Sequence, residues 1–275
     1  MIEVIRESAT AARATVAIFD FDGTLSLIRS GWIDVMVPLC VEQLSAFKTG
    51  ESEAELRECA EEFVWRLTGK ETIYQMMALA DAIGQRGGQP RPPLEYKKMY
   101  LDRLWLKIRN RLEGLRTGVI SPARYLVPGA KELLEQLTRR GVTLYLASGT
   151  DDANVKEEAA LLGVASHFDG RIFGAQDDLK SFSKALLVQR ILSTADGIKA
   201  DGLLVFGDGF VEIEEVKKAG GVAVGVATAE PECRMADPWK RERLIKAGAD
   251  YIVPNFLNLE ELFSVLFHTP AFMER

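Results

Sequence analysis

The chain has 275 residues, of which 47% are hydrophobic and 27% charged, and its formal net charge is −6. This length accommodates one α/β core and a smaller domain, and the composition is ordinary for a soluble globular protein. The acidic balance excludes general binding to nucleic acid or to anionic membranes, and we expect neither a signal peptide nor a membrane-spanning segment.

The first predicted strand is the apolar run Val16 to Phe19, which leads directly into Asp20-Phe21-Asp22-Gly23. Asp20 and Asp22 are two residues apart, so an extended backbone projects both side chains from one face. Two ionised carboxylates held this close repel each other unless a cation lies between them or one of them is protonated. An acidic turn after a buried strand is an alternative interpretation. A calcium loop is disfavoured, because the residues from Thr24 to Leu27 lack the further oxygen ligands that such a loop needs.

The segment from residue 26 to residue 126 has a helical pattern. Apolar residues recur at intervals of three and four between Leu56 and Leu67 and between Tyr96 and Ile108. The polar loop 86–93 separates two predicted helical hairpins. The polar break around Gly69 and Lys70 suits either a loop that meets substrate hydroxyls or a plain solvent-facing connection.

From residue 127 onward, predicted strands and helices alternate. We expect strands at 142–147, 171–173, 203–206, 221–226 and 251–253, and helices at 130–140, 154–162, 185–192 and 259–267. This alternation predicts an α/β fold with a doubly wound parallel sheet that helices cover on both faces.

Polar residues follow two of these strands directly. Ser148-Gly149-Thr150 offers a hydroxyl and small-residue amides that could hold a phosphate, although this triplet is common in turns. Asp208 follows the strand 203–206, and Glu212 lies on the first turn of the helix after it. Because the carboxyl ends of parallel strands meet at one edge of a sheet, we expect these groups near Asp20.

A lysine opens the helix that begins near residue 184. Ser183 is a typical capping residue, so Lys184 lies at the positive end of the helix dipole, and a lysine there suggests a negatively charged neighbour. Lys180 is an alternative, only four residues away. We prefer Lys184 because it opens the helix that leads into the strand 203–206.

In this order, the carboxylate pair, hydroxyl, lysine and second carboxylate pair resemble the four motifs of the haloacid dehalogenase superfamily of phosphotransferases. The matching residues are Asp20 and Asp22, Ser148, Lys184, and Asp208 with Glu212. The resemblance implies a Rossmann-like catalytic core at 1–25 and 127–275. It also implies an inserted α-helical cap domain of the first type at 26–126, as in the branch of phosphoglycolate phosphatase and β-phosphoglucomutase.

The resemblance also implies roles for these residues. Asp20 would be the nucleophile that forms an aspartyl-phosphate, and Asp22 would be the general acid and base. Mg²⁺ would be held by Asp20, Asp208, Glu212 and the carbonyl of Asp22. Ser148, Gly149 and Lys184 would bind the substrate phosphate. The candidates for substrate specificity are Arg29, Trp32, Gly69 and Lys70.

The expected activity is therefore a magnesium-dependent phosphatase acting on a sugar phosphate or a short phosphorylated acid. The presence of Asp22 argues against halide displacement, which has no leaving alcohol to protonate. A phosphomutase and a non-catalytic module that senses a phosphorylated metabolite are the alternatives. The three cysteines lack metal-type spacing, so we expect reduced thiols in a cytoplasmic protein that binds neither nucleic acid nor membranes.

Overall fold

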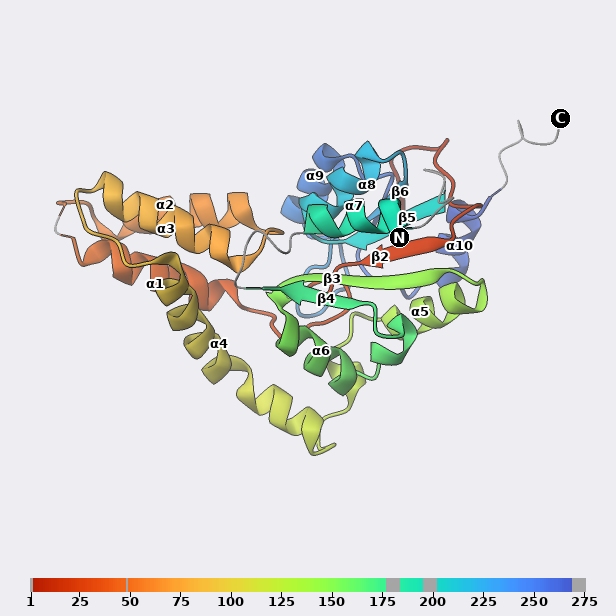
Figure 1. Cartoon of the computed structure of the whole chain (residues 1–275), viewed down its shortest axis with the longest axis horizontal. Coiled ribbons are helices and arrows are strands. Elements are labelled where there is room, and N and C mark those ends of the chain that lie inside the picture. The colour runs from red at the N-terminus through yellow and green to blue at the C-terminus, as the bar shows by residue number, and fades with distance from the viewer. Residues whose placement is uncertain (1, 48, 177–183, 195–201, 269–275) are drawn as a thin grey trace. The chain divides into compact units, whose positions relative to one another are not determined.

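The computed structural model describes residues 2–47, 49–176, 184–194 and 202–268 (Figure 1). It divides into two compact units, Met1–Ser30 with Gly114–Arg275 and the smaller Gly31–Glu113. Among the helices in the described ranges, none combines the length and the apolar character that crossing a membrane requires.

The larger unit is built on a seven-stranded sheet with the order β1-β7-β6-β5-β2-β3-β4. All neighbouring strands are parallel except the edge strand β1, which runs antiparallel to β7. The strands are β1 (Glu3–Val4), β2 (Val16–Phe19), β3 (Thr143–Asp151), β4 (Ile172–Ala175), β5 (Leu203–Gly207), β6 (Val222–Val226) and β7 (Tyr251–Val253). The predicted doubly wound α/β sheet is therefore confirmed, and β1 is an addition that its two-residue length hides from sequence patterns.

Helices cover both faces of this sheet (Figure 1). They are α5 (Ala130–Arg139), α6 (Asp152–Leu161), α7 (Lys184–Thr194), α8 (Phe210–Lys218), α9 (Pro238–Ala247) and α10 (Leu259–Leu266), with short 3₁₀ turns at Pro122–Arg124 and Ala165–Phe168. The predicted helices are confirmed to within about two residues, a normal uncertainty at helix ends.

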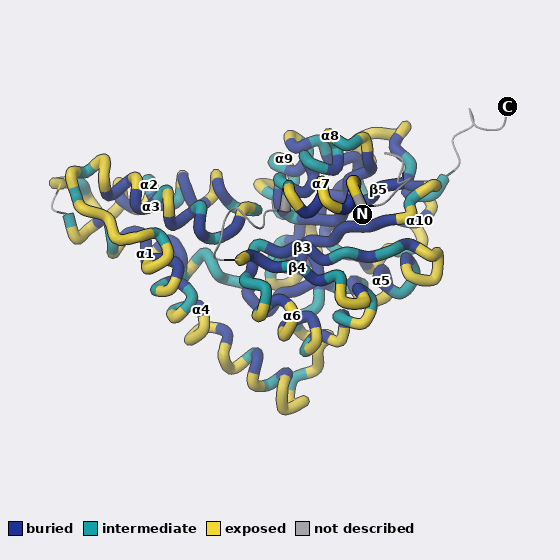
Figure 2. The backbone as a smooth tube through the Cα atoms, viewed as in Figure 1, coloured by how far each residue is buried: buried dark blue, intermediate teal, exposed yellow. Residues whose placement is uncertain are grey.

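The interior strand β2 is buried along its whole length (Figure 2), as expected for a parallel sheet between two helical layers. Val16 and Ile18 belong to a hydrophobic cluster that α7, α8 and α9 complete on one side. Phe19 points to the other side, where its ring stacks on Phe206 of β5 with centroids 4.7 Å apart. This packing fixes the ends of β2 and β5 side by side.

The smaller unit is helical, as predicted. It contains α1 (Ile33–Ser45), α2 (Glu53–Leu67), α3 (Thr72–Gln85) and most of α4 (Pro93–Arg116). Ser52 and Glu55 form a capping box that begins α2. The prediction of a second helical hairpin after the loop 86–93 is wrong, because α4 is one continuous helix of 24 residues. No glycine or proline interrupts the sequence between Pro93 and Gly114, so nothing in it ends the helix earlier.

Candidate active site

Three carboxylates meet where β2 and β5 end. Asp20 is the first residue after β2, and its N–H donates to the carbonyl of Phe206 in β5 over 2.9 Å. Asp208 follows β5 directly, and Glu212 lies in the first turn of α8. One carboxylate oxygen from each of these three acids lies within 4.8 Å of the others. The sheet order thus brings together acids that are almost 200 residues apart in the sequence.

This acidic cluster fits a hard divalent cation. Asp20 and Glu212 are 5% and 1% exposed, so water screens their mutual repulsion poorly. Oxygen donors of this kind, converging on one small volume, are the ligands that Mg²⁺ takes in proteins. The carboxylate of Asp22 is outside the cluster, and metal binding by its backbone carbonyl stays a prediction.

Two glycines make room for the cluster. A Cβ atom at Gly207 would lie 2.3 Å from Oε1 of Glu212, and one at Gly23 would lie 2.1 Å from Oδ2 of Asp208. Gly23 also has a φ of 74°, which other residues rarely adopt. The N–H of Gly209 donates to Oε1 of Glu212 over 3.0 Å. The backbone therefore approaches both carboxylates at places where no side chain fits.

Asp22 lies beside the cluster in a different environment. Its Oδ2 accepts a hydrogen bond of 2.7 Å from the hydroxyl of Thr150, and its Oδ1 is 4.0 Å from Nε of Arg29. Oδ1 is buried and has no hydrogen-bond donor among the residues that the structure describes. Burial raises the pKa of Asp22 above its ordinary value, although the charge of Arg29 and the Thr150 hydrogen bond oppose the shift. A carboxyl with a raised pKa keeps its proton to a higher pH than an ordinary aspartate does.

The phosphate-binding candidates lie on the neighbouring strand. The predicted strand was expected to end at Ala147, but β3 continues to Asp151. Ser148 is fully buried, and its Oγ accepts from the N–H of Thr150 over 3.0 Å. The pairing with β4 shifts register between Ala147 and Asp151. The triplet that we expected directly after the strand therefore lies within it, at a backbone irregularity.

The structure places the predicted lysine only in part. Lys184 is the first residue of α7, as predicted. Its side chain, and the alternative Lys180, lie outside what the structure describes. The choice between them stays a prediction.

Lys240 is a site residue that sequence reasoning missed. It lies in the first turn of α9, and its Nζ donates to Asp208 Oδ2 and Glu230 Oε1 over 2.9 Å each and to Thr228 Oγ1 over 3.2 Å. Burial alone would lower the pKa of Lys240, but the two carboxylates outweigh it and raise that pKa. No sequence signal distinguishes Lys240 from the basic residues around it, because its partners come from other elements.

The specificity candidates lie in both units. Arg29 belongs to the larger unit, where its guanidinium binds Glu158. Trp32, Gly69 and Lys70 belong to the smaller unit. Gly69 has a φ of 96°, and the ammonium of Lys70 lies 5.4 Å from the ring centre of Tyr74. Their contact with substrate stays a prediction.

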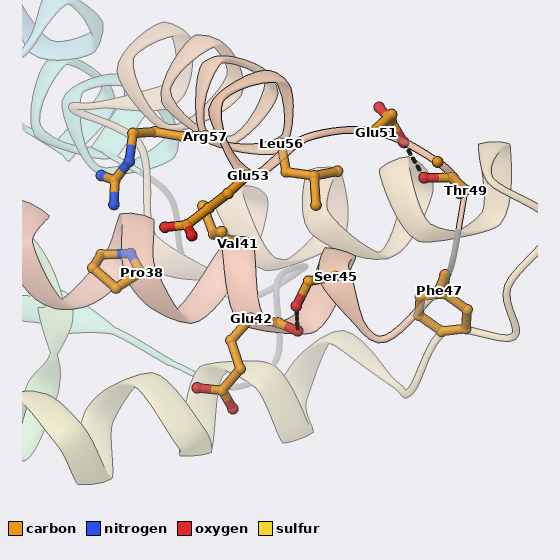
Figure 3. Close-up of a pocket in the computed structure, with 11 residues that line it drawn as sticks. Pro38, Val41, Glu42, Ser45, Phe47, Thr49, Glu51, Glu53, Leu56 and Arg57 are labelled. Carbon is orange, nitrogen blue, oxygen red and sulfur yellow. Dashed lines mark hydrogen bonds between the residues drawn. The ribbon is translucent and has the colours of Figure 1, made fainter.

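A separate cavity of about 540 Å³ opens beside α1 in the smaller unit (Figure 3). Its charged lining consists of Glu42, Glu51, Glu53 and Arg57. Glu51 already binds Arg86 over 2.6 Å, and the excess of acids would repel a phosphate anion. None of the predicted site residues lines this cavity, so we do not assign the phosphate site to it.

The chain is similar to known proteins in sequence and in fold. The family model described as haloacid dehalogenase-like hydrolase matches residues 14–220. A 5'-nucleotidase of Pseudomonas aeruginosa is 28% identical over 139 residues, which cover 50% of this chain and 62% of that protein. The match thus spans less than two thirds of that relative.

Two solved structures show the same fold. A predicted phosphoglycolate phosphatase from Haemophilus somnus aligns with a TM-score of 0.58 and 18% identity, over 91% of this chain and 98% of that one. A β-phosphoglucomutase from Clostridium difficile aligns with a TM-score of 0.59 and 16% identity, over 92% and 96%. At these identities the likeness concerns the fold.

Proposed function

The chain belongs to the haloacid dehalogenase-like hydrolase family, and from this premise we propose that it is a magnesium-dependent phosphatase working through an aspartyl-phosphate. The observation that carries the proposal is the buried cluster of Asp20, Asp208 and Glu212 beside Asp22. Phosphate monoesters are so unreactive that a covalent route, which splits the barrier into two steps, is a strong advantage.

In the first step, a carboxylate oxygen of Asp20 attacks phosphorus while the bond from phosphorus to the ester oxygen breaks. The N–H of Phe21 donates to Oδ1 of Asp20 over 2.7 Å and so fixes the orientation of the nucleophile. Asp22 gives its proton to the departing alkoxide. In the second step, Asp22 takes a proton from water, the water oxygen attacks phosphorus, and phosphate leaves Asp20.

The bound cation would be held by Asp20, Asp208 and Glu212, and would neutralise charge on the transferring group when present. Ser148, Gly149 and Lys184 would contact the remaining phosphate oxygens. Lys240 and the N–H of Gly209 hold two of these three acids in place through hydrogen bonds to Oδ2 of Asp208 and Oε1 of Glu212.

The proposed substrates are sugar phosphates and short phosphorylated acids. The partial match to a 5'-nucleotidase adds nucleoside 5'-monophosphates to the set worth testing. The smaller unit would serve as the cap that selects among them, through Trp32, Gly69 and Lys70.

A phosphate-release assay with these three substrate classes tests the proposal. We expect phosphate release with Mg²⁺ and none in excess chelator, and we expect Asp208→Ala to raise the Mg²⁺ concentration needed for half-maximal rate by about tenfold or more. Exchange between sugar phosphate isomers without phosphate release would favour the phosphomutase alternative. Binding without either reaction would favour a sensing module, and full activity in chelator would contradict the metal assignment.

A further inference from the structure

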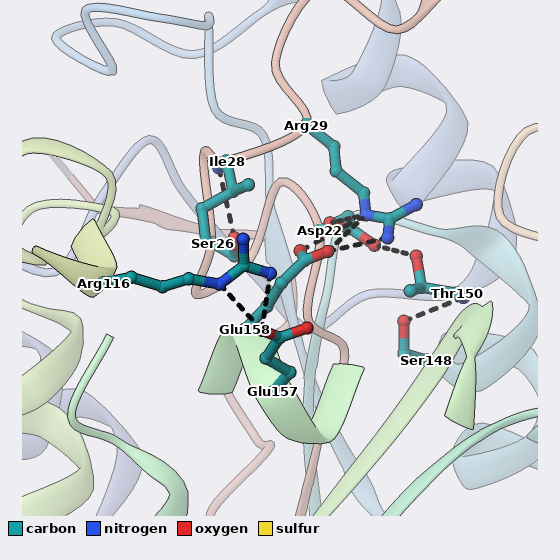
Figure 4. A network of polar contacts seen from close by, with 9 residues as sticks. All are labelled: Asp22, Ser26, Ile28, Arg29, Arg116, Ser148, Thr150, Glu157 and Glu158. Carbon is teal, nitrogen blue, oxygen red and sulfur yellow. Dashed lines mark hydrogen bonds and ion pairs between the residues drawn. The ribbon is translucent and has the colours of Figure 1, made fainter. Parts of the chain in front are cut away.

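Arg29 and Glu158 form an ion pair in the interior of the larger unit (Figure 4). Nε and Nη2 of Arg29 donate to Oε1 of Glu158 over 3.1 and 2.7 Å, and Nε also lies 3.2 Å from Oε2. The two side chains are only 10% and 3% exposed. A pair this deep costs desolvation, and removing one partner leaves the other charge buried alone.

The pair joins two segments that each carry part of the active site. Arg29 lies in the segment that follows Asp20 and Asp22, two residues before the smaller unit begins at Gly31. Glu158 lies on α6, which follows β3 and its Ser148-Gly149-Thr150 sequence directly. The ion pair therefore fixes the distance between the turn after β2 and the end of β3.

Asp22 lies between these two segments and touches both. Thr150 of β3 donates to its Oδ2 over 2.7 Å, while Nε of Arg29 is 4.0 Å from its Oδ1. Figure 4 shows the Asp22 carboxylate between the Arg29 and Thr150 side chains. Nε of Arg29 thus faces Asp22 while its hydrogen bonds of 3.1 and 3.2 Å run to the carboxylate of Glu158.

We propose that the buried Arg29–Glu158 pair is a positioning device for Asp22, which keeps its carboxyl aimed at the leaving-group oxygen. This inference rests on the proposed function, because it assigns the pair to the proton-transfer step. Arg29 and Glu158 are positioning residues, since they act on the reaction through Asp22.

The test compares two substrates that differ in their need for an acid. An alkyl phosphate needs a proton on its leaving oxygen, whereas 4-nitrophenyl phosphate releases a stable phenolate. We measure kcat/KM for both, because this constant reports the step in which the leaving group departs. The variants are Arg29→Met, Glu158→Gln and the double variant, with Asp22→Asn as the reference.

We expect each single variant to lower kcat/KM for the alkyl phosphate by about tenfold or more, and that for 4-nitrophenyl phosphate by less than about threefold. Because the pair acts as a unit, the double variant should lose no more than the worse single variant. Arg29→Lys keeps the positive charge but cannot make the bidentate contact with Glu158. It should therefore show the same selective loss of kcat/KM for the alkyl phosphate, with a milder effect on folding.

The control is the neighbouring pair of Glu157, on the same helix α6, with Arg116 at the end of α4, whose side chains are 48% and 36% exposed (Figure 4). Glu157→Gln should change neither constant by more than about twofold. Equal losses for both substrates in the Arg29 and Glu158 variants, or no loss at all, would overturn the positioning role. A wild type that releases no phosphate from either substrate would instead refute the proposed function.

Discussion

Lys240 adds a positive charge to a site that otherwise gathers carboxylates. The carboxylates of Asp208 and Glu230 both bind its ammonium. If Lys240 were removed, these two carboxylates would face each other without a counter-charge. At an effective dielectric near 20, two unit charges about 4 Å apart interact by about 4 kcal/mol. The lysine therefore offsets the repulsion between the Asp208 and Glu230 carboxylates.

We expect Lys240→Met to lower the free energy of unfolding by about 3 kcal/mol without divalent metal. Excess Mg²⁺ should restore part of this loss, because the added cation offsets the repulsion that the lysine relieved. Urea unfolding with and without Mg²⁺ measures both effects. Lys246→Met removes an exposed lysine paired with Glu242 on the same helix, and should cost less than about 1 kcal/mol. A loss as small as in this control, or one that Mg²⁺ leaves unchanged, would contradict the role of Lys240.

The two acids that the sequence locates best, Asp20 and Asp208, directly follow the strands β2 and β5. Each comes after an apolar run, and parallel strands bring such positions to one edge. The partners Lys240 and Glu158 lie inside helices, where their spacing resembles that of ordinary surface charges. Only the tertiary packing brings them to Asp208 and to Arg29.

At the scale of elements, hydrophobic periodicity located the strands and helices well. Ser148-Gly149-Thr150, which is typical of turns, lies inside β3 at the place where the pairing with β4 shifts register between Ala147 and Asp151. The local preference of this triplet thus coincides with an irregularity within the strand. In the smaller unit, the absence of helix-breaking residues between Pro93 and Gly114 is a better guide to the continuous α4 than the polar loop before it.

The junction of β5 and α8 depends on Gly207. A methyl group there would overlap Oε1 of Glu212, so Gly207→Ala should move this carboxylate away from the cluster. We expect a loss of about 1–3 kcal/mol in stability and a weaker binding of Mg²⁺ or Mn²⁺ by calorimetry. Gly84→Ala is the matched control, because a Cβ at Gly84 in α3 meets nothing within 4 Å. It should stabilise the protein by about 0.5–1 kcal/mol. Unchanged metal binding in Gly207→Ala would refute this account of Glu212.

At the scale of the whole molecule, the inserted helical unit leaves and rejoins the larger one through paired segments. The N–H of Leu27 donates to the carbonyl of Tyr125 over 2.8 Å, and that of Val127 donates to the carbonyl of Leu25 over 2.9 Å. Residues up to Ser30 consequently belong to the larger unit. The sequence pattern predicts the insertion, because helical periodicity replaces βα alternation there. It cannot reveal this pairing, since neither segment carries a strand pattern.

The central claim is that Asp20 carries the phosphoryl group. It is tested most directly by quenching the protein with acid during turnover, reducing it with borohydride, and sequencing the peptide that contains residue 20 by mass spectrometry. An aspartyl-phosphate is reduced to homoserine, so we predict homoserine at position 20 when substrate and Mg²⁺ are present. Asp20→Asn should show none and should release no phosphate. Unmodified Asp20 in a wild type that is turning over substrate, or an Asp20→Asn variant within about tenfold of the wild-type rate, would contradict the covalent route.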